Sequence, residues 1–259
     1  YHFNGGFCGS VLNIPCISNS AWDFPFKNVA NNSRRMKILN LYACLGGNRY
    51  KWDEVTDVEV TAVELDPEAA RLYQERFPND TVIVADAHQY LLDHYKEFDF
   101  IWSSPPCPTH SRIQLSQKTR RKMKYPDMKL YQEIIFLDTF FDGKYVVENV
   151  IPYYEPLIPA KKRDRHLYWT NFNLPNVLSK RKSPNMAVQS AGIKKYKKLN
   201  KKVFDVFCDF HDYNFKKYKG KQDLGKMSRN LVDYEAGKTI LETALGIIKK
   251  QNEKQTELF

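Results

Sequence analysis

Two side chains in this sequence combine residue types and settings that could do chemistry: Cys107, which follows two prolines, and Glu148, which precedes an asparagine. Each comes after an apolar run that reads as a buried strand, residues 98–102 and 145–147. A cysteine on a stiff turn and an acid at a strand end could face one cleft. There a thiolate could attack an electron-poor ring while the acid gives that ring a proton. The alternatives are an inert buried cysteine and a strand-end salt bridge.

The surroundings of Cys107 bear on its reactivity. We expect thiolate character to come from a nearby helix N-terminus or from basic neighbours. Zinc is disfavoured, although His110 lies close in sequence, because no CxxC pair exists and two further ligands are missing. The five cysteines are scattered and odd in number, which predicts a reducing compartment instead of a disulfide framework.

Strands and helices alternate along the chain from Lys37. Apolar runs predict strands, and apolar residues at helical spacing predict helices. This order favours an α/β fold with a doubly wound, mostly parallel sheet. The predicted strands are 38–42, 58–65, 81–85, 98–102 and 145–147, and the predicted helices are 67–77, 127–141 and 235–250.

Polar groups follow three successive predicted strands, where ligands of doubly wound sheets bind. Gly46 and Gly47 lie after the first strand, Glu64 ends the second and Asp86 follows the third. An acid at the second position commonly binds the hydroxyls of a ribose, and Asp86 could accept a hydrogen bond from an adenine amine. The set suggests a cofactor that contains adenosine. The alternatives are an ordinary turn, a surface acid and a helix N-cap.

Two arginines, Arg163 and Arg165, follow about 15 residues after Glu148. If the segment is extended, side chains at i and i+2 point the same way. They could then hold a phosphate, a carbonyl oxygen of a base, or Glu148 itself.

The net charge of +10 is concentrated in one segment. Residues 170–226 contain 14 Lys or Arg residues and 4 Asp residues, an excess equal to that of the whole chain. Aromatic residues alternate with these lysines, and a run begins with Lys194, Lys195, Lys197 and Lys198. Such a segment is typical of contact with nucleic acid; a solvated basic face is the alternative. No stretch of 18 apolar residues predicts a membrane span.

The pattern suggests four parts. Residues 1–35 are irregular, begin at Tyr1 and make a poor signal peptide, so we expect an extension that is irregular or non-native, with Met36 as a possible start. We expect a catalytic and cofactor-binding domain over 36–169, a short basic target-recognition segment over 170–226, and a C-terminal helix over 227–259 that returns to the catalytic domain.

Several motifs together resemble the DNA (cytosine-5) methyltransferases, in that family's order, over residues 37–250. Residues 147–150 are similar to the acid motif, and residues 104–107 with Ser111 resemble the nucleophile motif. The weaker matches are residues 41–47 (cofactor glycines), 63–66 (ribose), 85–87 (adenine), 163–165 (paired arginines) and 230–232 (last motif). The chain departs from the family at Pro108 and His110, where Gln and Phe are usual.

This resemblance implies a Rossmann-like methyltransferase fold and the cofactor S-adenosylmethionine. It implies that Cys107 attacks carbon 6 of a flipped-out cytosine, that Glu148 binds ring nitrogen 3, that Arg165 binds the ring oxygen, and that Arg163 orients the acid. The residues that it assigns to the cofactor are Tyr42, Gly46, Gly47, Glu64, Asp86, Pro106 and Asn230, and it places Ser111 near the DNA. From the basic segment, Lys194, Lys195, Lys197 and Lys198 are expected to contact DNA as well.

The expected partner is double-stranded DNA, bound by a monomer without metal or membrane, in the cytoplasm of a bacterium or a phage host. Two alternatives remain open. One is an RNA cytosine-5 methyltransferase, which would use the same thiol chemistry. The other is a catalytically silent DNA-binding relative, which the departures at Pro108 and His110 suggest.

Overall fold

The computed structural model describes residues 34–116, 122–184 and 201–248. All elements below belong to the compact unit that begins at Arg35. The predicted extension over residues 1–35 lies almost wholly outside the described ranges, so its nature stays a prediction.

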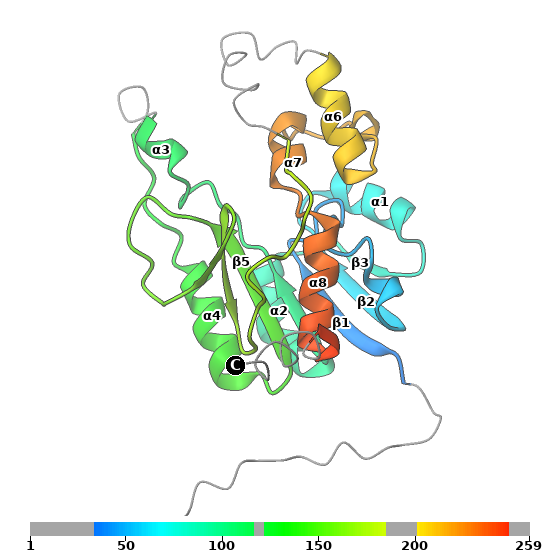
Figure 1. The fold of residues 1–259 in the computed structure, drawn as a ribbon, viewed down its shortest axis with the longest axis vertical. Coiled ribbons are helices and arrows are strands. Elements are labelled where there is room, and N and C mark those ends of the chain that lie inside the picture. The colour runs from blue at the N-terminus through cyan, green and yellow to red at the C-terminus, as the bar shows by residue number, and fades with distance from the viewer. Residues whose placement is uncertain (1–33, 117–121, 185–200, 249–259) are drawn as a thin grey trace, which may run out of the picture. The chain divides into compact units, whose positions relative to one another are not determined.

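The described residues form a seven-stranded sheet in the order β3-β2-β1-β4-β5-β7-β6 (Figure 1). Neighbouring strands among β1–β5 pair in parallel, β7 runs antiparallel to β5, and β6 runs antiparallel to β7. The predicted doubly wound, mostly parallel sheet is therefore confirmed. The strands are β1 (Met36–Leu41), β2 (Val58–Val63), β3 (Thr81–Ile83), β4 (Phe100–Ser103), β5 (Lys144–Val150), β6 (Lys161–Arg163) and β7 (His166–Thr170).

Helices begin where the sequence supplies capping side chains. The Asp66 carboxylate accepts hydrogen bonds from the N–H groups of Glu68 and Ala69, and Pro67 opens α1 (Pro67–Arg76). Asp86 caps α2 (Ala87–His94) in the same way. The other helices of the described part are α3 (Ile113–Ser116), α4 (Lys129–Phe140), α6 (Lys201–His211), α7 (Leu224–Asn230), α8 (Tyr234–Ala244) and the 3-10 turns η1 (Trp52–Glu54), η2 (Tyr95–Glu97) and η4 (Phe215–Lys217).

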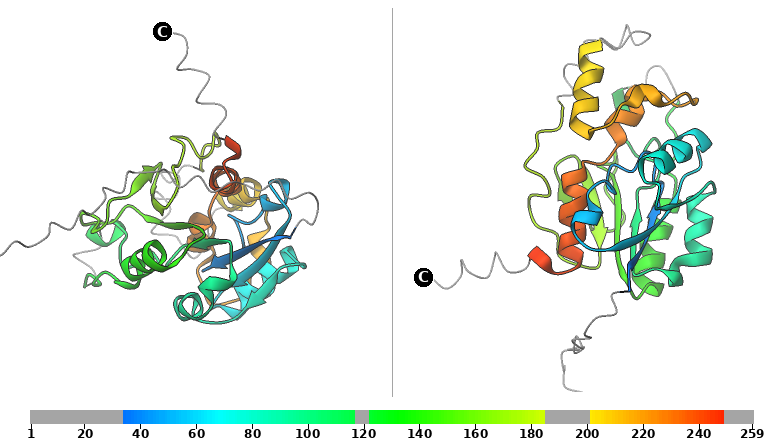
Figure 2. Two further views of the ribbon diagram at one scale, coloured as in Figure 1. Left: turned by 90° about the horizontal axis from the view of Figure 1, so that it is seen from below. Right: turned by 90° about the vertical axis from the view of Figure 1, so that its right-hand side faces the viewer.

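Helices lie on both faces of the sheet (Figure 2), and an apolar layer covers each face. Helices α2 and α4 pack on one face, where Leu91 and Leu137 are fully buried. Helix α8 packs on the opposite face with η1, where Ile240 and Trp52 are fully buried. Burial on both faces explains why the central strands read as continuous apolar runs.

The chain after β1 approaches the C-terminal helices backbone to backbone. A Cβ at Gly47 would lie 2.4 Å from the carbonyl oxygen of Val232, and a Cβ at Gly237 would lie 2.2 Å from that of Asn48. Only glycine permits such contacts. This packing holds α7 and α8 against the end of the sheet where the parallel strands finish.

Several expected boundaries are wrong. The last helix ends at Ala244, not residue 250, because Gly246 adopts φ +74 and its N–H bonds back to Thr243. No strand is predicted after residue 147, yet the segment after residue 150 contains the β6–β7 hairpin and helices α6 and α7. Both strands are short, and β6 consists of three charged residues, so neither gives a clear apolar pattern.

Candidate active site

A cavity of about 650 Å³ lies at the carboxyl ends of β1, β2, β4 and β5. Cys107 and Glu148 both line it, so the expected convergence of thiol and carboxyl on one cleft agrees with the structure. Of the other residues predicted for the site, the cavity is lined by Tyr42, Gly47, Glu64, Asp86, Pro106 and Asn230.

Cys107 begins a tight turn after β4. Its carbonyl oxygen accepts hydrogen bonds from the N–H groups of His110 and Ser111, both across 3.0 Å. The side-chain amide of Asn230, the last residue of α7, lies 3.9 Å from the Cys107 sulfur. The thiol is thus fixed between the nucleophile loop and the C-terminal return.

The resting thiol is a weak acid. Burial raises the pKa of Cys107, the Glu148 carboxylate raises it further, and the Lys226 ammonium acts in the opposite direction. The expectation that a helix terminus or basic neighbours would give thiolate character is therefore wrong for this state. One cation opposes two larger influences.

Glu148 is 8% exposed near the end of β5. His166, at the start of β7, places its Nε2 3.5 Å from Glu148 Oε1. Asn149, the next residue, donates from Nδ2 to the carbonyl oxygen of Pro105 across 2.9 Å. This bond ties the strand that carries the acid to the loop that carries the thiol.

At the second strand end, Glu64 accepts hydrogen bonds from the backbone N–H groups of Cys44 (2.9 Å) and Asp66 (2.8 Å). Burial raises the pKa of Glu64, whereas those two N–H groups lower it. The N–H of Leu65 also contributes, and a carboxylate with about four acceptor positions still has room for a ribose hydroxyl. The Leu65 side chain, 69% exposed, lines the cavity beside it and offers an apolar surface to an aromatic base.

Asp86 combines two positions that the sequence left as alternatives. It is the N-cap of α2, and the N–H of Gln89 is the largest of several influences that hold its pKa below the usual value. It also lines the cavity. Asp86 can therefore cap α2 and still contact a ligand in the cavity.

Tyr42 rests on a buried carboxylate that the sequence did not single out. Its hydroxyl donates to Glu133 Oε1 across 2.6 Å, and Glu133 is fully buried. Ser103 Oγ donates to the other oxygen (2.6 Å), and His88 Nδ1 lies 2.9 Å from Oε1. These contacts hold Tyr42 in a left-handed conformation, φ +56, at the cavity wall.

Four predicted site residues do not line this cavity. Gly46 (φ +67) faces the core, where its Cβ would lie 2.4 Å from the Phe77 ring. Ser111 pairs with Pro152 in an isolated β-bridge. Arg163 and Arg165 line a second cavity of about 1020 Å³.

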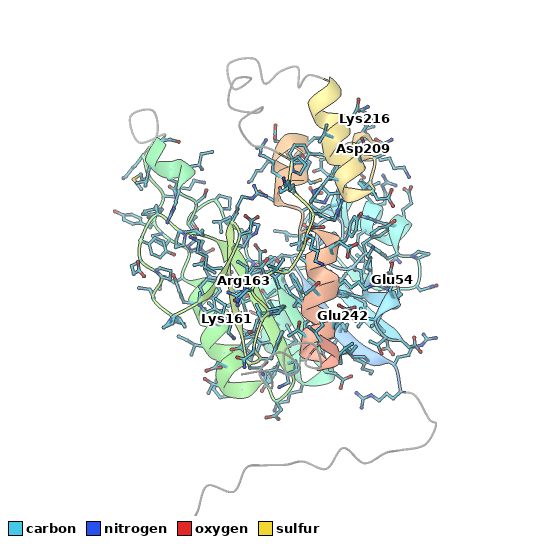
Figure 3. The ribbon with its side chains drawn as sticks, in the orientation of Figure 1. Glu54, Lys161, Arg163, Asp209, Lys216 and Glu242 are labelled. Carbon is cyan, nitrogen blue, oxygen red and sulfur yellow. The ribbon has the colours of Figure 1, made fainter. Side chains whose placement is uncertain are left out.

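The expectation that the two arginines lie on an extended segment beside Glu148 is wrong, because a two-residue turn separates β6 from β7, Asp164 takes φ +48, and both arginines line the second cavity. Arg163, labelled in Figure 3, donates to the carbonyl oxygens of Leu174 (2.8 Å) and Pro175 (2.5 Å). Arg165 donates to Ser183 Oγ.

The remaining predictions concern four lysines, a metal site and a membrane span. The four lysines Lys194, Lys195, Lys197 and Lys198 lie outside the described residues. Within the described ranges, no group of three or more His, Cys, Asp and Glu side chains could hold a metal ion. No helix of the described part has the length and apolar character needed to cross a bilayer.

Sequence reasoning missed two further residues that line the cavity, His166 and Lys226. His166 directly follows the paired arginines, but its position depends on the unpredicted β5–β7 pairing. Lys226 stood among many lysines, and nothing in its spacing distinguished it.

Residues 36–151 match the model of the C-5 cytosine-specific DNA methylase family. No curated protein sequence matches the chain.

Among solved structures, a mutant of DNMT2 from Spodoptera frugiperda is similar, with 15% identity and a TM-score of 0.50, over 81% of this chain and 99% of that one. EhMeth from Entamoeba histolytica shares 11% identity with a TM-score of 0.48, over 84% and 100% of the two chains. The DNMT2 likeness supports the fold alone.

The matched region contains β1–β5, Cys107 and Glu148. The cavity also fits the adenosine-bearing methyl donor of such enzymes, since two acidic acceptors and an uncovered leucine follow successive strands. Residues 36–151 are therefore similar to the C-5 cytosine-specific DNA methylase family, whose members use S-adenosylmethionine.

Proposed function

We propose that this chain methylates carbon 5 of a flipped-out cytosine in duplex DNA and that Cys107 forms a transient covalent bond to the ring. The observation that supports the proposal is that Cys107 and Glu148 line one cavity. The hydrogen bond from Asn149 to Pro105 links the segments that carry them. A thiol and an acid so placed suit addition to a pyrimidine.

In the proposed reaction, the Cys107 sulfur attacks carbon 6 while nitrogen 3 gains a proton from Glu148. The carbon 5–carbon 6 pair becomes a carbon 4–carbon 5 double bond as the carbon 4–nitrogen 3 pair moves to nitrogen 3, so carbon 5 becomes the nucleophilic end of an enamine. Because burial and the nearby Glu148 raise the pKa of Cys107, the thiol must lose its proton to water as it attacks.

The cofactor would lie along the strand ends, with Glu64 on the ribose, Asp86 on the adenine and Tyr42, Gly47 and Pro106 along the wall. Asn230 completes this wall from α7, between the cofactor and the thiol. When bound, S-adenosylmethionine supplies the electrophilic methyl group that carbon 5 accepts. Water then takes the carbon 5 proton, nitrogen 3 returns its proton to Glu148, and the carbon 5–carbon 6 double bond forms again as the sulfur leaves.

The proposed substrate is duplex DNA because the excess positive charge lies in residues 170–226, which precede the C-terminal return. Flipping the base out of the stack costs a few kcal/mol, which contacts to the phosphates must offset. We assign that role to residues 170–226, including Lys194, Lys195, Lys197 and Lys198, and expect a monomer to suffice.

Methyl transfer from isotopically labelled S-adenosylmethionine tests the proposal. Wild-type protein is compared with Cys107→Ser on mixed-sequence duplex DNA and on transfer RNA. The control is Cys208→Ser, because Cys208 lies on α6 and does not line the cavity. We expect transfer to DNA by wild type and the control, and none by Cys107→Ser, which should still bind DNA.

Other outcomes would contradict specific parts. Transfer to RNA alone would mean that the substrate is RNA and not DNA. No transfer to either nucleic acid would favour a catalytically silent DNA-binding protein. Neutralising Lys194, Lys195, Lys197 and Lys198 should weaken DNA binding and flatten its dependence on salt. An unchanged salt slope would remove these lysines from the phosphate contacts.

A further inference from the structure

We propose that His166 is the positioning residue for Glu148, in the place that the family resemblance gives to an arginine. The inference rests on the proposed function, since it concerns the acid that would act on the target base. Two observations support it: His166 contacts Glu148 inside the cavity, and hydrogen bonds hold Arg163 and Arg165 at the second cavity.

The β5–β7 pairing brings His166 to the acid. His166 lies opposite Val150, and Tyr168 lies opposite Glu148, so all four side chains lie on one face of the sheet. From this diagonal position His166 Nε2 reaches within 3.5 Å of Glu148 Oε1. Both residues line the cavity that contains Cys107.

Neither arginine has this access. Three N–H groups of Arg163 donate to the carbonyl oxygens of Lys162, Leu174 and Pro175. Arg165 donates to Ser183 Oγ and lies 3.8 Å from the Asp164 carboxylate. The turn at Asp164 directs both toward the second cavity.

Cys107 and Tyr168 interact electrostatically with Glu148, and Lys226 is one of several other ionisable residues that line the same cavity. The Lys226 side chain is exposed on α7, and its charge acts on the Cys107 thiol. Tyr168 lies across the β5–β7 pair. Within the described residues, His166 is the neighbour whose ring nitrogen contacts a Glu148 oxygen.

Histidine suits this position chemically. Either an arginine or a histidine could orient the carboxyl, and here the histidine is the side chain in contact with it. A neutral imidazole with its proton on Nε2 can donate to Oε1 and leave Oε2 for the base. The distance of 3.5 Å is long for a hydrogen bond, and such catalytic contacts tighten when substrate binds.

The test compares His166→Ala, His166→Gln and Arg165→Ala by steady-state methyl transfer. We expect His166→Ala to lower kcat about 10- to 100-fold, as a displaced catalytic group does, with KM for DNA within about twofold. Glutamine can place an N–H near the position of Nε2, so His166→Gln should retain most of kcat. The control is His94→Ala, which removes a His–Glu pair of 2.8 Å outside the cavity.

Crystal structures of the two His166 variants give an outcome that does not depend on turnover. The Glu148 carboxyl should change rotamer in His166→Ala and keep its place in His166→Gln. An unmoved carboxyl in His166→Ala, or an unchanged kcat, overturns the inference. If wild type transfers no methyl group to any nucleic acid, the proposed function fails, while the two structures still decide the positioning.

Discussion

Asn149 Nδ2 donates a hydrogen bond to the carbonyl oxygen of Pro105 across 2.9 Å, and both residues are buried. Asn149 follows the acid on β5, and Pro105 lies two residues before the thiol. One bond therefore fixes the distance between the two groups that the proposed reaction needs.

Replacing Asn149 with alanine should separate that pair. We expect kcat to fall about 10- to 100-fold, because a displacement near 1 Å can cost that much. The unpaired Pro105 carbonyl should also lower the free energy of unfolding by about 1–3 kcal/mol. Methyl-transfer kinetics and chemical denaturation measure the two effects.

Asn171→Ala is the matched control. Its amide donates to the carbonyl oxygen of Gly143 across 2.8 Å, near the other end of β5. It should lose stability without a comparable loss of kcat. Equal kinetic losses in both variants would mean that the Asn149 bond acts only through stability.

Tyr42→Phe tests the buried support of the cofactor wall. The variant removes the 2.6 Å bond to Glu133, a hydrogen bond to a charged group worth about 1.5–3 kcal/mol of stability. Because Tyr42 is held at φ +56, losing its anchor should also weaken cofactor binding by about fivefold, or about 1 kcal/mol. Calorimetric titration with S-adenosylhomocysteine measures this.

Tyr145→Phe serves as the control, since Tyr145 donates to Asp138 across 2.9 Å and does not line the cavity. It should cost stability and leave the affinity unchanged. An unaltered affinity of Tyr42→Phe for S-adenosylhomocysteine would show that the left-handed conformation at Tyr42 does not need the hydrogen bond to Glu133.

Asp80→Asn should be among the more destabilising single changes. Arg49 donates from Nε and Nη2 to the two Asp80 oxygens at 2.8 and 2.9 Å, and both side chains are at most 4% exposed. Removing the carboxylate charge leaves a buried guanidinium poorly compensated, which costs about 3–5 kcal/mol. Urea denaturation provides the measurement.

Asp53→Asn is the comparison, because Asp53 contacts the same guanidinium but its side chain is 66% exposed. Its removal should cost less than about 1 kcal/mol. Similar losses from both variants would mean that Arg49 does not depend on the buried member of the pair.

The sheet could be predicted from the sequence because its signal is local. Strands β1, β2, β4 and β5 are apolar runs buried on both faces, and the caps Asp66 and Asp86 precede their helices directly. Cys107 and Glu148 could be placed together for the same reason: Cys107 follows β4, Glu148 lies near the end of β5, and parallel strand ends meet at one edge.

The position of the two arginines could not be predicted, because it depends on one backbone dihedral angle. Arg163 and Arg165 look equivalent in sequence, yet Asp164 at φ +48 makes a turn between them. Glu133 and His166 could not be found because their partners are remote: Tyr42 is 91 residues from Glu133, and Glu148 meets His166 only across an unpredicted antiparallel pair. Gly46 matched a ligand motif, but its missing side chain faces Phe77.

Acid should destabilise the fold through His211, which is 3% exposed at the end of α6. Burial lowers the pKa of His211 to about 4, and the charge of Arg76 contributes in the same direction. Between the ordinary histidine pKa and about 4, the unfolded chain binds a proton that the folded one does not. Stability therefore falls as pH falls through this range, by up to about 3 kcal/mol.

His211→Gln should remove this part of the pH dependence, since glutamine does not titrate. Denaturation midpoints of wild type and variant, measured from pH 7 to pH 4, are expected to converge as the solution becomes more acidic. His110 adds a smaller effect of the same sign, because burial also lowers the pKa of its imidazole. Parallel curves for the two proteins over this range would mean that His211 is protonated equally well in the folded state.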